Sequence, residues 1–145
     1  MAKVLIKKLD PAVKLPSYKT IGASGMDLMA FIKKPINVKS KTSSLIPIGL
    51  SVAFSEDYEI QIRPRSGLAA KNNISVLNTP GTIDSDYRGE IKVIIFNHGN
   101  DDFIINNGDR IAQMVLTPVL KMELQEIDKL PKTIRGEGGF GSTGK

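Results

Sequence analysis

The sequence has no cysteine among its 145 residues and only one histidine. Without cysteine the chain cannot form disulfides, attack a substrate with a thiolate, or bind a metal through thiolates. The single histidine, His98, lies in the turn-like sequence NHGND and has no companion serine or carboxylate at a telling spacing. We therefore expect His98 to be a surface turn residue. With no cysteine and one histidine, the sequence also lacks the ligands for a zinc site.

Long apolar runs are also absent. The N-terminal sequence MAKVLIKKLD contains an apolar run far too short for a signal sequence or a membrane span. We therefore expect a soluble, cytoplasmic protein with no membrane partner. Hydrophobic residues make up 41% and charged residues 24% of the sequence, which is typical of a globular chain. Because no repeat or linker divides it, the chain is expected to form one domain.

The sequence offers no amphipathic stretch of ten residues or more, and only Gly67–Lys71 looks helical. Short runs rich in isoleucine and valine recur instead, bounded by Pro, Gly, Asn and Asp. This pattern predicts an all-β, jelly-roll-like sandwich or barrel with one short helix. Within it, residues 80–97 look like a β-hairpin. The predicted strands are residues 3–6, 26–32, 44–54, 58–63, 90–97, 103–105 and 111–116.

Two common nucleotide-binding motifs are missing. There is no G-x-x-x-x-G-K-[ST] sequence and no G-x-G-x-x-G between a strand and a helix. P-loop and Rossmann nucleotide binding are therefore excluded.

Positive charge is concentrated near the N-terminus. Residues 1–42 carry nine lysines against two aspartates, whereas residues 43–145 carry eleven basic and thirteen acidic side chains. A basic segment can bind nucleic acid, but these lysines are scattered through apolar runs with only Tyr18 and Phe31 available to stack on bases. We expect solvated strand faces and no nucleic-acid partner. The acidic excess in the remainder suits a site that holds a cation.

The last eleven residues read RGEGGFGSTGK, with five glycines around a single aromatic residue. Such a segment is typical of a flexible terminus. Glycine also lets backbone approach a ligand, and arginine and exposed N–H groups suit phosphate. The same residues could thus form a flap that closes over a nucleotide. We expect a β domain over residues 1–134 and a flexible glycine-rich arm over residues 135–145.

Polar residues gather in four further clusters. Each has a structural explanation alone, for instance Ser66 as a helix N-cap or Asp84 and Asp86 as turn formers. Jointly they supply carboxylates for a hard cation, hydroxyls and arginines for phosphates, and glycines where backbone must come close. The clusters are Ala23–Leu28 (ASGMDL), Pro64–Lys71 (PRSGLAAK), Asn78–Gly89 (NTPGTIDSDYRG) and Gly108–Gln113 (GDRIAQ).

These clusters and the C-terminal segment resemble, in order and spacing, the five motifs of homotrimeric dUTPases, from residue 23 to residue 144. The resemblance implies a dUTP diphosphatase, which hydrolyses dUTP to dUMP and diphosphate with Mg²⁺. Such an enzyme limits uracil incorporation into DNA and supplies dUMP for thymidylate synthesis. It also implies a homotrimer in which the C-terminal arm closes a neighbouring subunit's site, with residues 115–130 as a possible exchanged strand and linker.

The resemblance assigns roles around the phosphates. Asp84 would activate the attacking water, and Asp27 would hold Mg²⁺ through coordinated water. Ser66 would steady the leaving diphosphate and Gln113 would contact the α-phosphate. Arg65 and Gly67 would support the Ser66 loop. The terminal phosphates would be clamped by residues of the arm, namely Arg135, Ser142 and Thr143.

The resemblance also assigns the nucleoside contacts. Tyr87 would pack under the deoxyribose and leave no space for a 2′-hydroxyl. Asn78, together with backbone near Gly81 and Lys92, would bind the uracil edge. Phe140 would stack over uracil, and Gly141 beside it would allow the arm to close.

Two alternatives stay open at this point. A dCTP deaminase, or a bifunctional deaminase–diphosphatase, on the same fold would need a catalytic glutamate, and Glu90 is the nearest one. A non-enzymatic binding or regulatory protein could also use the same fold, although the motif residues are intact.

Overall fold

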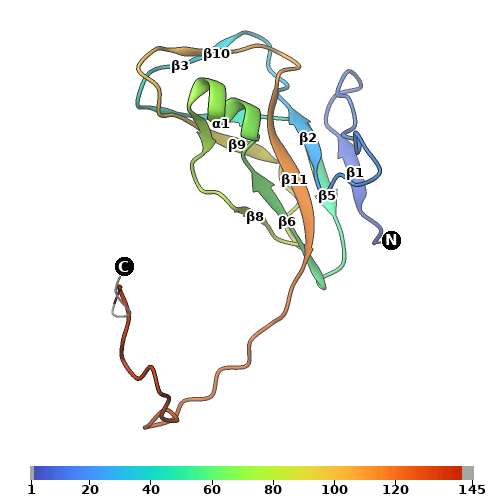
Figure 1. The fold of residues 1–145 in the computed structure, drawn as a ribbon. Helices are drawn as coiled ribbons and strands as arrows, with labels where there is room; N and C mark the ends of the chain where they lie inside the picture. The colour runs from blue at the N-terminus through green and yellow to red at the C-terminus, as the bar shows by residue number, and fades with distance from the viewer. Residues whose placement is uncertain (1, 142–145) are drawn as a thin grey trace.

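The computed structural model describes residues 2–141, which form eleven strands and one short helix (Figure 1). The predicted all-β fold with one short helix is thereby confirmed. The elements are β1 (Leu5–Lys8), β2 (Met26–Met29), β3 (Ile36–Val38), β4 (Ser43–Pro47), β5 (Leu50–Ala53), β6 (Tyr58–Arg63), α1 (Ser66–Asn72), β7 (Ile74–Val76), β8 (Gly81–Ile83), β9 (Lys92–Asn97), β10 (Phe103–Ile105) and β11 (Arg110–Pro118).

The strands pair antiparallel in four sheets. The largest has the order β2-β11-β6-β8, and a three-stranded sheet has the order β4-β9-β7. Two smaller pairs, β1-β5 and β3-β10, complete the sandwich. The long strand β11 lies at the centre of the largest sheet, so it connects the elements that carry most of the motif residues.

The core is built from the branched aliphatic side chains of alternating strand positions. In β6, Ile60 and Ile62 are buried, and in β9, Val93 and Ile95 are buried. The side-chain amide of buried Asn97 donates to two backbone carbonyls, that of Val38 in β3 and that of Asp101 in a loop. Period-two burial of this kind favours strands over helices, which explains why the sequence pattern predicts the fold class correctly.

The predicted hairpin over residues 80–97 is wrong. Strand β8 pairs with β6, whereas β9 pairs with β4 and β7, so the two strands lie in different sheets. Local alternation identifies a strand but not its partner, because pairing is decided by packing across the whole domain. The connection over residues 84–91 therefore crosses between sheets, and it opens a pocket there.

Strands β3 and β7, each three residues long, are absent from the sequence-based prediction. The predicted helix is confirmed as α1. No helix among residues 2–141 is long and apolar enough to cross a membrane. His98 is exposed in a turn, where Nε2 lies 2.7 Å from Oγ of Ser75.

Strand β11 ends at Pro118, and residues 119–141 contain no helix or strand and extend away from the body (Figure 1). Residues 115–118 pair with the chain's own β6, so the predicted exchanged strand cannot begin at Val115. Residues 119–141 pair with no strand of the described chain, so a strand exchanged with a neighbour would begin after Pro118. The proposed domain boundary at residue 134 stays a prediction.

Candidate active site

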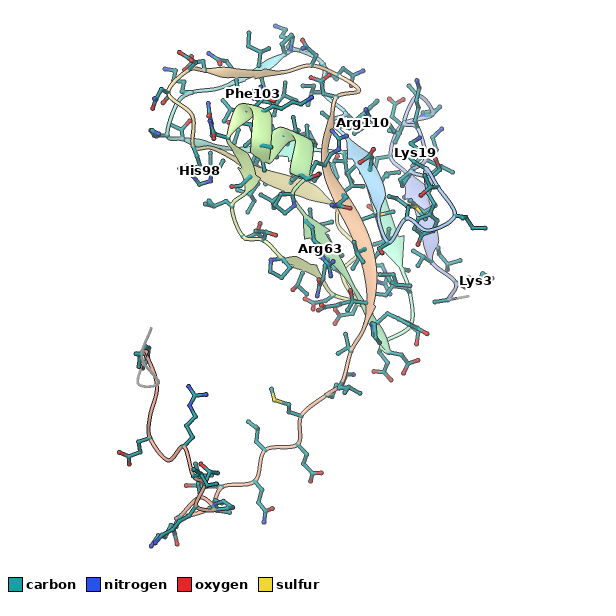
Figure 2. All side chains as sticks on the ribbon, viewed as in Figure 1. Lys3, Lys19, Arg63, His98, Phe103 and Arg110 are labelled. Atoms are coloured by element: carbon teal, nitrogen blue, oxygen red, sulfur yellow. The ribbon has the colours of Figure 1, made fainter. Side chains whose placement is uncertain are left out.

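Asp27 on β2 is held by two arginines that come from distant parts of the chain. Its Oδ1 accepts a hydrogen bond from Nε of Arg65 at 3.0 Å, and its Oδ2 accepts one from Nη1 of Arg110 at 3.2 Å. Arg65 also donates to the carbonyl of Arg110 at 2.8 Å. The Asp27 side chain is 18% exposed and that of Arg110 is 52% exposed, so this corner offers positive charge to solvent (Figure 2).

Gln113 lies on β11 directly opposite Asp27 in the strand register. Its Nε2 donates to the carbonyl of Pro64 at 3.0 Å, so it fixes the turn that leads into α1. Gly25 makes this arrangement possible. A Cβ atom at Gly25 would lie 2.7 Å from Oε1 of Gln113 and 3.2 Å from the Met114 carbonyl.

Substitution of Gly25 by alanine should therefore displace Gln113 and strain the pairing of β2 with β11. We expect the free energy of unfolding to fall by about 1–3 kcal/mol, as for other overpacked sites. Denaturant unfolding would measure the change. The matched control is Gly22→Ala, because a Cβ at Gly22 meets nothing within 4 Å. Equal stability of the Gly25 and Gly22 variants would show that the close approach is absent in solution.

Ser66 and Gly67 form the first turn of α1, and both are exposed. The predicted N-cap role of Ser66 is wrong. The N-cap is Arg65, in an extended conformation and with no side-chain cap hydrogen bond, and Ser66 is the first helical residue. Its hydroxyl is therefore not used for capping and stays exposed beside the arginine corner.

A second group of motif residues lines a pocket of about 450 Å³ between the two main sheets. Asp84 and Tyr87 are three residues apart in one turn, closed by a hydrogen bond from the Tyr87 N–H to the Asp84 carbonyl at 3.2 Å. Lys92, at the start of β9, lines the same pocket, and Leu45 of β4 forms part of its wall. A carboxylate, a ring and an apolar wall thus face one cavity.

Asn78 and Gly81 are also brought together, beside this pocket. Gly81 is buried, and a Cβ there would lie 3.0 Å from Nδ2 of Asn78. The absence of a side chain at Gly81 thus lets the Asn78 amide lie close against the backbone at the start of β8.

The third group, on the arm, does not meet the other two. Arg135, Phe140 and Gly141 are exposed, and Phe140 has a relative exposure of 115%. Figure 2 shows the side chains of the arm projecting with no other part of the chain beside them. Ser142 and Thr143 lie outside the described residues.

The segment that leads from β11 to the arm is attached to the body where it begins. The Val119 N–H donates to the Asp57 carbonyl at 2.8 Å, and Nζ of Lys121 donates to Oε2 of Glu56 at 2.8 Å. The hydrogen bond that Lys121 donates to Glu56, together with the negative charge of Glu56, raises the pKa of Lys121. The direction in which the arm leaves the body is thus set at residues 119–121.

The first two groups lie at opposite edges of the largest sheet. Gly81 on β8 aligns through Ile62 and Met114 with Met26 on β2. Since neighbouring strands are about 4.8 Å apart, the outer strands are separated by roughly 14 Å. One chain therefore presents three separate groups of motif residues.

The oxygen ligands present suit magnesium bound mainly by a substrate. Among residues 2–141 no three acidic or histidine side chains come together as a metal cage. Mg²⁺ is commonly held by one or two carboxylates with phosphates and waters. Each oxygen of Asp27 accepts one arginine hydrogen bond, and a carboxylate has about four acceptor positions. Asp27 can therefore still accept from a metal-bound water.

Comparison with known proteins decides the family. The family profile described as dUTPase matches residues 12–144. The chain belongs to the dUTPase family, the dUTP diphosphatases. It is 54% identical over 145 residues to the deoxyuridine 5′-triphosphate nucleotidohydrolase of Rickettsia bellii, covering 99% of this chain and 97% of the relative. It is 52% identical over 146 residues to the enzyme of the same name from Fusobacterium nucleatum, covering both chains completely.

Solved dUTPase structures share the fold. A variant of the dUTPase of Staphylococcus bacteriophage 80alpha, solved with dUpNHpp, matches with a TM-score of 0.87 at 22% identity and 99% coverage of both chains. A variant dUTPase from phage phi11 of S. aureus, described with a coordinated structural Mg(II) ion, matches with a TM-score of 0.80 at 18% identity. That match covers 90% of this chain and 99% of the phage chain. These likenesses confirm the dUTPase fold for this chain.

Sequence reasoning did not single out Gly25 or Arg110. Both lie inside clusters that the sequence analysis identifies, ASGMDL and GDRIAQ. The sequence does not reveal their contacts, because Arg110 meets Asp27 across 83 residues of sequence.

Proposed function

We propose that this dUTPase hydrolyses dUTP by attack of a water on the α-phosphorus, with Asp84 as the general base. The observation that carries the proposal is the shared pocket of Asp84, Tyr87 and Lys92, in a chain of the dUTPase family. Asp84 accepts the proton of the water as the new P–O bond forms, and the bond to the β-phosphate oxygen breaks to release diphosphate. The products are dUMP and diphosphate.

The arginine corner provides the phosphate contacts in this proposal. When bound, Mg²⁺ neutralises and orients the phosphates, with Asp27 holding it through water. The exposed hydroxyl of Ser66 donates to the leaving diphosphate, supported by Arg65 and Gly67. Gln113 contacts the α-phosphate with its second amide hydrogen, because the first is used by the Pro64 carbonyl.

The pocket between the sheets provides the nucleoside contacts. Tyr87 packs under the deoxyribose and blocks a 2′-hydroxyl. Asn78 and the backbone near Gly81 and Lys92 bind the uracil edge, so that cytosine would leave buried polar groups unpaired. Phe140 covers the uracil, and Gly141 gives the arm the freedom to close.

The three separate groups of motif residues support a site shared among copies of the chain. Leu120, Met122 and Leu124 are 86–95% exposed and alternate along the segment that leads to the arm, as on a strand with one apolar face that needs a partner. We propose a threefold homotrimer in which this segment pairs with a neighbour. Arg135, Ser142 and Thr143 then clamp phosphates in that neighbour's site.

In the cell, this reaction lowers the dUTP available for incorporation into DNA and supplies dUMP for thymidylate synthesis. We place the enzyme in the cytoplasm, with the free deoxynucleotides on which it acts. Fractionation of cells with an activity assay on each fraction tests the location.

Diphosphate release from each deoxynucleoside triphosphate, with and without Mg²⁺, tests the function. We expect diphosphate to be released from dUTP and from no other deoxynucleoside triphosphate. Mg²⁺ should strongly increase the rate of this release. Ammonia release from dCTP would overturn the proposal in favour of a deaminase.

A further inference from the structure

The turn that carries Asp84 and Tyr87 is held at several backbone points. Besides the bond from the Tyr87 N–H to the Asp84 carbonyl, Nη1 of Arg88 donates to the carbonyls of Ser85 at 2.6 Å and Tyr87 at 3.0 Å. Three carbonyls of one exposed turn are thereby satisfied within the turn itself. The backbone on which the Tyr87 ring stands is thus fixed.

The far end of the ring is fixed as well. Oη of Tyr87 donates to the carbonyl of Glu90 at 3.0 Å. Glu90 is itself anchored, because its Oε1 accepts from the N–H of Gly49, in the tight turn between β4 and β5. A chain of hydrogen bonds therefore ties the tyrosine hydroxyl to the neighbouring strand pair.

Gly89 leaves the space in which the ring lies. A Cβ atom at Gly89 would be 2.3 Å from Oη, 2.5 Å from Cζ and 2.9 Å from Cε2 of Tyr87. These distances are below any normal carbon contact, so a side chain at Gly89 must push the ring away. Gly89 is not among the positive-φ glycines, so the ring rather than the backbone conformation requires glycine here.

We propose that Gly89 and Glu90 are positioning residues that make Tyr87 a rigid wall against the ribose 2′-hydroxyl. The inference rests on the proposed function, in which Tyr87 packs under the deoxyribose. Steric rejection of one oxygen atom works only if the wall cannot move aside. A ring held at its backbone and at its hydroxyl cannot swing, whereas a ring released at either point can admit a ribose.

The test compares kcat/KM for dUTP and UTP in purified full-length variants. Tyr87→Ala removes the wall and should give the largest fall in the dUTP:UTP ratio. Gly89→Ala should lower the ratio by about tenfold, mainly by raising kcat/KM for UTP. Tyr87→Phe removes only the hydroxyl bond and should give a smaller fall in the same direction.

A conservative pair separates positioning from general loss of structure. Glu90→Gln keeps an amide oxygen that can accept from the Gly49 N–H, so it should retain the wild-type ratio, whereas Glu90→Ala should lower it. Gly22→Ala, a glycine substitution in open space, should leave the ratio unchanged. Thermal unfolding of each variant shows which variants are folded. If Gly89→Ala does not fold, the dUTP:UTP ratios of Tyr87→Phe, Glu90→Gln and Glu90→Ala decide whether the ring must be held in place.

The outcomes distinguish this inference from the proposed function. If Tyr87→Ala lowers the ratio but Gly89→Ala, Tyr87→Phe and Glu90→Ala do not, the wall exists without the clamp and the inference is overturned. If Tyr87→Ala leaves the ratio unchanged, the assigned role of Tyr87 is wrong and the clamp has no function. A wild-type enzyme that does not hydrolyse dUTP would overturn the proposed function itself.

Discussion

Replacing Asp84 by asparagine should lower kcat for dUTP by about a thousandfold, equivalent to ~4 kcal/mol of activation free energy. An amide has nearly the same shape as the carboxylate but cannot accept the proton of the attacking water. The affinity for a non-hydrolysable dUTP analogue should change little, because Asp84 acts on the water. Steady-state kinetics and analogue titration measure the two effects.

Asp86 provides a matched control for this substitution. It is exposed in the same turn, two residues further on, but it is not part of the wall of the pocket that Asp84 and Tyr87 share. Asp86→Asn should therefore keep near wild-type turnover. Wild-type turnover by Asp84→Asn, or an equal loss in both variants, would show that the general base lies elsewhere.

The sequence predicts elements well where burial alternates over several residues. The predicted strand at residues 58–63 coincides with β6, because isoleucine recurs at the inward positions Ile60 and Ile62. It does not predict pairing. The run at residues 90–97 was assigned to a hairpin, yet β9 lies between β4 and β7, which approach from other parts of the chain.

For the candidate site too, the sequence predicts local features but not long-range contacts. Motif order and spacing indicate which residues carry the chemistry, because each motif is a short local pattern. Their contacts depend on long-range packing, as in the ion pair of Arg65 with Asp27, which joins positions 38 residues apart. The requirement for glycine at Gly25 and Gly89 likewise arises from a side chain that folding brings against each of them.

Deletion of residues 135–145 should abolish measurable turnover of dUTP while the body keeps its stability. The deletion removes Arg135, and the loss of one well-placed donor to developing charge alone lowers kcat by about a hundredfold or more. It also removes Phe140, the proposed cover of the uracil, so the two losses combine. The segment up to residue 134 remains, including the alternating apolar residues proposed to pair with a neighbour. Because Arg135 and Phe140 are exposed, the unfolding free energy should change by less than about 0.5 kcal/mol.

Co-expression of this truncated chain with full-length Asp84→Asn identifies whose site the arm closes. The truncated chain contributes an intact Asp84 without an arm, and the other contributes an arm without the base. If the arm crosses to a neighbour in a closed ring, about a quarter of the sites in a random equal mixture receive both. Activity should then appear although each variant alone is inactive. If the arm folds back onto its own chain, no site receives both, and a mixture as inactive as its components would overturn the shared site.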